Sequence, residues 1–140
     1  MNIKVRIEEA KERVMKLSTD TLKANVSRFD EVVCVYLFGS VARGEAGKLS
    51  DIDIAVLLSS SIDTDRLLDL IGAISGALGR DADVSILNDL SLPIQYRVIR
   101  DGKLLYSANE QARIGFESRV IDEYLDLKPR LEQYIEKWME

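Results

Sequence analysis

The segment that most restricts the fold is an apolar run that opens with two aspartates, DIDIAVLLS at residues 51–59. A run of this length, rich in branched aliphatic residues and bounded by polar segments, predicts a buried strand. Because side chains alternate along a strand, Asp51 and Asp53 share one face and stand side by side at its start. Carboxylates are costly to desolvate there and repel each other. Either they point into water, or a positive charge lies between them.

A second apolar run, VVCVYLF at residues 32–38, predicts another buried strand. Gly39 and Ser40 end this strand, SVAR opens a short helix, and the two glycines of residues 44–50 predict a loop. A strand that turns into a helix start presents backbone N–H groups that can hold a phosphate. Ser40 adds a hydroxyl group and Arg43 a guanidinium group to this turn.

The rest of the chain alternates helices and strands. Helical periodicity predicts helices over 4–28, over 65–78 and from Pro93 to Gly102, and short apolar runs predict strands over 82–88 and 103–107. Ser18 and Thr19 leave open a division of the first helix into two, and Asp63 or Thr64 caps the second helix. This order predicts an α/β (α+β) fold, in which a small mixed sheet has flanking helices.

From Asn109 onward the sequence predicts a long C-terminal helical segment with an apolar stripe. Pro129 is expected to kink or split this helix after Leu127 or Lys128, because proline lacks the N–H group that the helix uses. The stripe belongs either to the core or, in its terminal part near Tyr134 and Trp138, to a surface for a partner.

The strand at 82–88 offers a third carboxylate. Asp83 directly precedes its apolar residues and joins the pair at 51–53 if the two strands are neighbours. Asp81 has the same parity and is the competing candidate. Three mutually close carboxylates cost on the order of 10 kcal/mol at an effective dielectric constant of about 20. Protonation, divergence into water or a bound dication relieves this cost, and oxygen ligands suit Mg²⁺ or Mn²⁺.

Composition excludes several classes of function. The chain has 140 residues, which predicts a single domain over 1–140. A net charge of -5 without a basic stripe argues against binding nucleic acid, and the absence of histidine removes His-based catalysis. The single cysteine, Cys34, excludes an internal disulfide and is expected to be a buried thiol. The charged N-terminus lacks a signal core and no apolar run is long enough for a membrane span, so we expect a cytoplasmic location.

The segment GSVARGEAGKLSDIDIAVLL resembles the signature of the nucleotidyltransferase superfamily related to DNA polymerase β. That signature is Gly-Ser, ten residues, Asp-x-Asp and a third acidic strand. The short chain, together with the C-terminal segment FESRVIDEYLDLKPRLEQY, is similar to the minimal nucleotidyltransferases that are antitoxin partners of HEPN-domain ribonuclease toxins. The resemblance implies the nucleotidyltransferase fold over residues 1–140.

The resemblance also implies a mechanism and roles for the residues of this chain. Gly39 and Ser40 would hold the triphosphate of ATP, with help from Arg43. Two Mg²⁺ ions would be bound by Asp51 and Asp53, and Asp83 would complete the metal ligands and help to activate the acceptor. AMP would then pass from ATP to a tyrosine hydroxyl of the toxin, and pyrophosphate would leave.

Two alternatives remain open. In the first, the chain is a non-catalytic antitoxin that neutralises its toxin by binding alone. In the second, it transfers a nucleotide to a small molecule such as an aminoglycoside, although such enzymes usually carry an added helical domain for the acceptor. Neither alternative predicts a membrane or nucleic-acid partner.

Overall fold

The computed structural model describes residues 2–39 and 52–139, and of residues 7, 8 and 10–18 it describes the backbone. The predicted short helix of SVAR and the predicted loop at 44–50 lie outside the described residues. Among the described residues, no helix combines the length and the apolar character needed to cross a lipid bilayer.

A four-stranded mixed sheet forms the centre of the described structure, in the order β3-β2-β1-β4. The strands are β1 (Val32–Phe38), β2 (Ile52–Leu58), β3 (Ala82–Ile86) and β4 (Lys103–Ser107). β1 pairs antiparallel with both β2 and β4, whereas β2 and β3 run parallel. The parallel pair requires a crossover between β2 and β3, which the chain makes through a helix.

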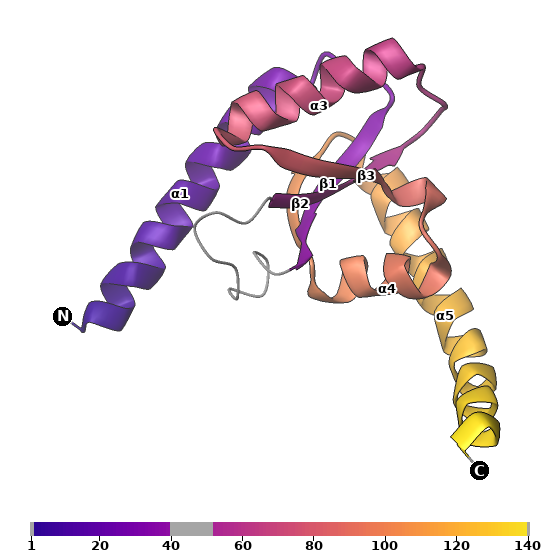
Figure 1. The fold of residues 1–140 in the computed structure, drawn as a ribbon. Helices are drawn as coiled ribbons and strands as arrows, with labels where there is room; N and C mark the ends of the chain where they lie inside the picture. The colour runs from indigo at the N-terminus through magenta and orange to yellow at the C-terminus, as the bar shows by residue number, and fades with distance from the viewer. Residues whose placement is uncertain (1, 40–51, 140) are drawn as a thin grey trace.

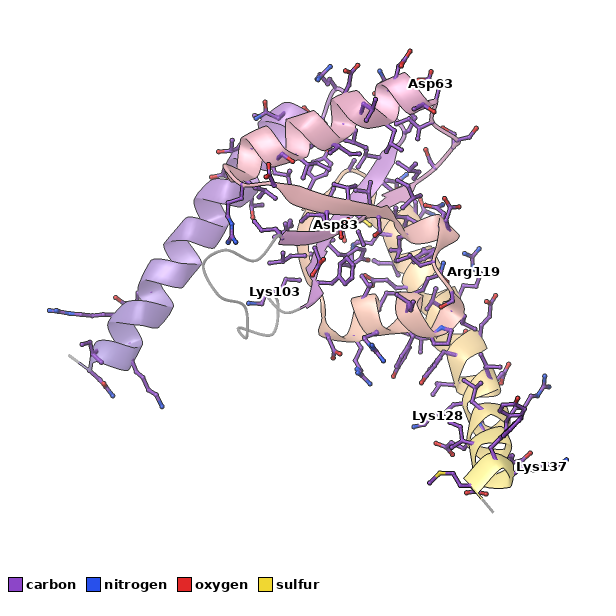
Figure 2. All side chains as sticks on the ribbon, in the orientation of Figure 1. Asp63, Asp83, Lys103, Arg119, Lys128 and Lys137 are labelled. Atoms are coloured by element: carbon purple, nitrogen blue, oxygen red, sulfur yellow. The ribbon has the colours of Figure 1, made fainter. Side chains whose placement is uncertain are left out.

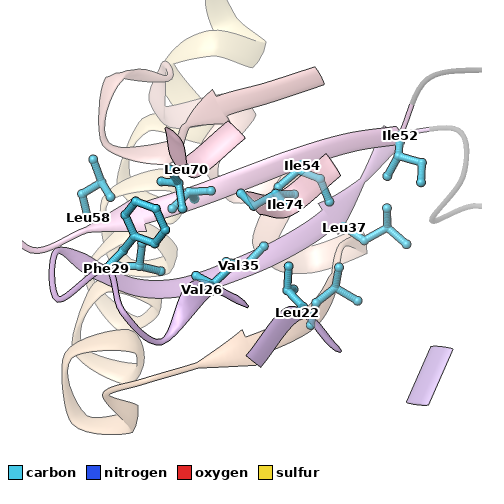
Figure 3. Close-up of a cluster of buried hydrophobic side chains, with 13 residues drawn as sticks. Leu22, Val26, Phe29, Val35, Leu37, Ile52, Ile54, Leu58, Leu70 and Ile74 are labelled. Atoms are coloured by element: carbon cyan, nitrogen blue, oxygen red, sulfur yellow. The ribbon is translucent and has the colours of Figure 1, made fainter. Parts of the chain in front are cut away.

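Helices cover both faces of this sheet (Figure 1). They are α1 (Ile3–Val26), α3 (Thr64–Leu78), α4 (Leu92–Asp101) and α5 (Glu110–Met139). α1 and α3 cover one face, and their side chains form a cluster with Val35, Leu37 and Ile54 of the sheet (Figure 3). α4 and α5 cover the other face, where Cys34 and Tyr36 belong to a second cluster. The predicted mixed sheet with flanking helices is therefore confirmed.

Local sequence signals explain where α3 begins and ends. The Asp63 carboxylate accepts a hydrogen bond from the Arg66 backbone N–H at 2.8 Å, so Asp63 rather than Thr64 is the N-cap. Gly79 ends the helix with a φ of 67°, in the left-handed region that glycine adopts without strain. Its buried residues Leu70 and Ile74 face the sheet, and this packing compensates for the three glycines in its sequence.

The structure decides one boundary that the sequence left open and corrects two others. The division of the first helix at Ser18 and Thr19 does not occur, since α1 is one continuous helix. α5 likewise continues through Pro129 without a split, because a single missing N–H on an exposed helix surface can be compensated by water. β3 ends at Ile86 rather than at residue 88.

The early end of β3 has a specific cause in Asn88. The Asn88 amide accepts a hydrogen bond from the Leu58 N–H and donates one to the Leu58 carbonyl, both at 2.9 Å. This side chain satisfies the backbone of β2 where β3 would otherwise continue. Residues Leu87–Asp89 then form a short 3₁₀ turn.

Candidate active site

The predicted phosphate turn and the predicted aspartates meet where β1 ends and β2 begins. Phe38, the last residue of β1, is the register partner of Asp53 on β2. Gly39 follows with a φ of 75°, a backbone conformation that L-residues with a side chain rarely adopt. A Cβ atom placed on Gly39 would lie 3.0 Å from Cγ and 3.2 Å from Cβ of Asp53. The half-buried Asp53 side chain therefore lies directly against the Gly39 backbone.

Asp83 stands beside Asp53 on the neighbouring strand. The two residues are register partners in the parallel pair of β2 and β3, so their side chains leave the same face of the sheet. Asp83 lies on β3 and is exposed (Figure 2). Asp81 precedes β3, and its backbone carbonyl accepts a hydrogen bond from the Ile52 N–H at 3.3 Å. The register thus places Asp83, rather than Asp81, opposite Asp53.

The pair of carboxylates has an electrostatic cost that a cation would remove. Side chains on directly opposed strand positions are about 5 Å apart, and two unit charges at that distance repel by roughly 3 kcal/mol at an effective dielectric constant of about 20. The described residues contain no cluster of three or more acidic, cysteine or histidine side chains arranged to hold a metal. The predicted additional ligand, Asp51, lies outside the described residues.

The structure therefore brings together three of the predicted site residues, Gly39, Asp53 and Asp83. Ser40 and Arg43 lie, like Asp51, outside the described residues. The two described carboxylates are hard oxygen donors on one sheet face, with the exposed Asp83 beside the half-buried Asp53. This donor set fits Mg²⁺, which binds proteins through one or two carboxylates and retains several waters.

A polar network on the same sheet face was not foreseen from the sequence. The Tyr36 hydroxyl donates a hydrogen bond to Oε1 of Glu117 at 2.5 Å, and Nη1 of Arg113 donates to the same oxygen at 3.0 Å. Arg113 also pairs with Glu110. Burial, followed by the hydrogen bond to Glu117, raises the pKa of Tyr36 well above its ordinary value. The network ties α5 to β1, next to the strand end that carries the site.

The sequence around Tyr36 does not indicate which residue its hydroxyl contacts. Its partner Glu117 is 81 residues away along the chain, and only the packing of α5 on β1 brings the two together. The Tyr36 hydroxyl is buried in the second cluster, where it needs a partner. A tyrosine at an inward position of a predicted strand was the only available hint.

The family assignment rests on these same elements. Residues 20–111 match the family model described as polymerase beta, nucleotidyltransferase. The chain belongs to the polymerase β-type nucleotidyltransferase family. The matched range contains Gly39, Asp53 and Asp83, and the predicted resemblance is confirmed.

Known members of the nucleotidyltransferase family extend the comparison. The chain is 30% identical to Protein adenylyltransferase MntA of Shewanella oneidensis over 105 residues, which cover 75% of each protein. It matches a chain in the crystal structure of a toxin-antitoxin with AMP-PNP with a TM-score of 0.69 and 27% identity, covering 87% of this chain and 98% of that one.

A second solved structure shows a product of such a system. It is the tri-AMPylated Shewanella oneidensis HEPN toxin in complex with MNT antitoxin, matched with a TM-score of 0.67 and 25% identity over 90% of this chain and 99% of that one. These nucleotidyltransferase relatives thus act with a nucleotide and a protein partner.

Proposed function

We propose that this chain is an Mg²⁺-dependent protein adenylyltransferase that acts as an antitoxin, transferring AMP from ATP to a tyrosine hydroxyl of a cognate HEPN-domain ribonuclease toxin. The observation that carries the proposal is the register of Asp53 and Asp83 on adjacent parallel strands, beside the Gly39 turn. The 30% identity to Protein adenylyltransferase MntA supports the choice of protein as acceptor. In this proposal residues 1–140 form one nucleotidyltransferase domain.

The proposed phosphate site is the turn that begins at Gly39. Its left-handed backbone and the lack of a Cβ atom let the chain turn within contact distance of Asp53. Ser40 and Arg43 follow in the sequence and supply a hydroxyl and a guanidinium group for phosphate oxygens. The triphosphate would then be held beside the carboxylates.

The proposed metal ligands are Asp51, Asp53 and Asp83. Bound Mg²⁺ ions would neutralise phosphate charge and polarise the α-phosphorus for attack. Asp83 is exposed, so it is accessible to an incoming acceptor, and we assign it the role of accepting the proton of the tyrosine hydroxyl. The half-buried Asp53 lies against the Gly39 backbone, and its carboxylate is on the same sheet face as Asp83.

The proposed reaction is a single displacement at phosphorus. The tyrosine oxygen of the toxin forms a bond to the α-phosphorus of ATP, and the bond from that phosphorus to the bridging oxygen of the β-phosphate breaks. The toxin gains AMP as a phosphodiester, pyrophosphate leaves with the bonding electron pair, and the hydroxyl proton passes to the carboxylate. Proximity of acceptor and nucleotide would supply much of the rate.

The test is AMP transfer to a cognate HEPN-domain toxin, which is first sought in the reading frame next to the one that encodes this chain. The two purified proteins are incubated with Mg²⁺ and ATP labelled in the α-phosphate, and the toxin is analysed by autoradiography and intact mass. Label on a toxin tyrosine supports the proposal. Wild-type chain that leaves the toxin unlabelled, or Asp53→Asn chain that labels it fully, refutes it.

The same experiment separates neutralisation by binding from neutralisation by chemistry. If Asp53→Asn still protects cells from the toxin as well as the wild type does, the chain is a binding antitoxin. Cells that express the toxin with the variant are expected to stop growing.

A further inference from the structure

The apolar stripe of α5 is covered over its first half and becomes increasingly exposed over its second. Phe116 and Val120 are buried in the cluster beneath the sheet, and the Tyr124 ring stacks on Tyr96 of α4 with 4.0 Å between ring centroids. Beyond this point Leu127 and Leu131 are half-buried, and Tyr134 is 60% and Trp138 74% exposed. Figure 1 shows this part of α5 extending past α4, away from the sheet. The first half of the stripe is core, and its terminal part at Tyr134 and Trp138 lacks a cover among the described residues.

The spacing of the stripe is that of a helix-docking seam. Its residues are separated alternately by four and three positions, which is the a and d pattern of a coiled coil. They are Val120, Tyr124, Leu127, Leu131, Tyr134 and Trp138. In this register Pro129 occupies position f, on the side opposite the seam. Its missing N–H group therefore does not interrupt the docking surface.

Basic and acidic side chains lie on different sides of the seam. Lys128, Arg130 and Lys137 occupy its two flanks, at positions e and g. The flanking acid Glu123 is already paired with Arg119 at 3.9 Å. The remaining acids of this segment lie on the outer positions b, c and f; they are Asp122, Asp126, Glu132 and Glu136. Figure 2 shows Lys128 and Lys137 on the part of α5 that extends past α4. The seam is thus an apolar strip with basic edges.

We propose that the seam of α5 from the half-buried Leu127 to the exposed Trp138 docks a helix of the toxin substrate whose apolar stripe is flanked by carboxylates. A helix is selected by the heptad spacing, and acidic flanks are selected by the basic edges. The identity of the partner as the toxin rests on the proposed function. A second copy is a poorer occupant, because antiparallel pairing of two copies would set Lys128 and Arg130 against their own counterparts.

The seam carries its own reporter, since Trp138 is the single tryptophan of the chain. The probe is a synthetic helical peptide of about three heptads with leucine at a and d and glutamate at e and g. A basic twin peptide, used as the control, has the same sequence but carries lysine at e and g. Titrated into the full chain, the acidic peptide is expected to shift Trp138 emission to the blue and to bind at least about tenfold more tightly than the basic twin.

A matched pair of variants tests the location of binding. Tyr134→Glu places a carboxylate in the seam, and Gln133→Glu makes the same change one residue away on the outer side. Tyr134→Glu is expected to lower the affinity for the acidic peptide by at least about tenfold, and Gln133→Glu is expected to leave that affinity unchanged. Circular dichroism checks that both variants retain the helix content of the wild type.

In the binding and sedimentation experiments, three outcomes overturn the docking proposal. They are equal or undetectable binding of the two peptides, binding that survives Tyr134→Glu, and self-association of the chain in sedimentation velocity that Tyr134→Glu abolishes. The last outcome would assign the seam to a second copy.

Steady-state AMP transfer separates this proposal from the proposed function. Tyr134→Glu is expected to raise the KM for the toxin and to leave the KM for ATP unchanged. If the wild-type chain binds the acidic peptide but does not label the toxin, the proposed function fails and the docking surface stands. If labelling proceeds with an unchanged toxin KM in Tyr134→Glu, the docking proposal fails alone.

Discussion

The carboxylate of Asp53 lies against the backbone of Gly39, where a Cβ atom would be 3.0 Å from the carboxyl carbon. The same glycine has a φ of 75°, so two independent constraints exclude a side chain there. One constraint concerns the backbone alone, and the other concerns the position of a proposed metal ligand. Substitutions that affect the backbone constraint alone or both constraints together show which of them AMP transfer requires.

Gly39→Ala is expected to lower AMP transfer by at least about 100-fold, because the added methyl group displaces the Asp53 carboxylate. The strained backbone also costs roughly 1–3 kcal/mol of unfolding free energy. Transfer of labelled AMP to the toxin and urea denaturation measure the two effects separately.

Gly79→Ala is the matched control for this substitution. Gly79 has a φ of 67°, but a Cβ atom there would meet no heavy atom within 4 Å among the described residues. The variant is therefore expected to lose about 1 kcal/mol of stability with near-normal transfer. Equal loss of activity in both variants would contradict the role assigned to the Gly39–Asp53 contact.

Asp83→Asn and Asp81→Asn are expected to differ sharply. Asp83 is in register with Asp53, whereas Asp81 precedes the strand and contributes its backbone carbonyl to Ile52. We expect kcat to fall by at least about 100-fold in Asp83→Asn and to change less than about twofold in Asp81→Asn. Both measurements use saturating ATP and toxin over a range of Mg²⁺ concentrations. The reverse ranking would transfer the third-carboxylate role to Asp81.

Much of the fold could be predicted because the signals are local. β1 and β4 match their predicted ranges, since each is a short apolar run bounded by turn residues. The alternation of side chains in β2 also placed Asp53 on one face without a structure. Asp83 could be placed opposite Asp53 only once the parallel register of β2 and β3 was known, because sequence does not specify which strands pair.

The missed features depend on contacts between distant segments. The Asn88 amide binds the backbone of Leu58, 30 residues away, and thereby ends β3 early. The low helix propensity of proline led us to expect a break at Pro129, but this residue lies on an outer surface of α5 and the helix continues through it. The sequence also did not show which half of the α5 stripe belongs to the core. Packing decides this, because α4 covers Tyr124 and stops short of Trp138.

Tyr36→Phe is expected to destabilise the chain without removing its activity. The variant loses a buried hydrogen bond to the Glu117 carboxylate, which costs roughly 1–3 kcal/mol. The Tyr36 hydroxyl belongs to the link between α5 and β1, and Tyr36 is not among the residues proposed to bind the nucleotide or the metal. Urea denaturation should show the loss, and kcat at low temperature should stay within about twofold of the wild type.

Tyr106→Phe on the neighbouring strand is the control for this change. Among the described residues, no hydrogen bond of the Tyr106 hydroxyl is seen, so the same deletion there should cost less than about 0.5 kcal/mol. If the two variants are equally stable, the Tyr36–Glu117 bond contributes nothing to the attachment of α5.

The buried thiol of Cys34 is expected to make the free energy of unfolding depend on pH in the alkaline range. Burial is the main reason that the pKa of this thiol rises from an ordinary 9.0 to about 11. Above pH 9 the unfolded chain releases the thiol proton while the folded chain retains it, so the unfolded state is favoured increasingly until the folded thiol also ionises near pH 11. The contribution is therefore fully present below about pH 9 and is lost between about pH 9 and 11.

Cys34→Ala isolates this effect, because alanine does not ionise and all other titrating groups are common to both chains. The stability difference between wild type and variant should be constant from about pH 6 to 8 and should shrink between about pH 9 and 11, as measured by urea denaturation at each pH. Iodoacetamide should also modify the native thiol at pH 8 far more slowly than the denatured one, since only the thiolate reacts. A stability difference that is independent of pH would mean that the folded thiol ionises as readily as the unfolded one.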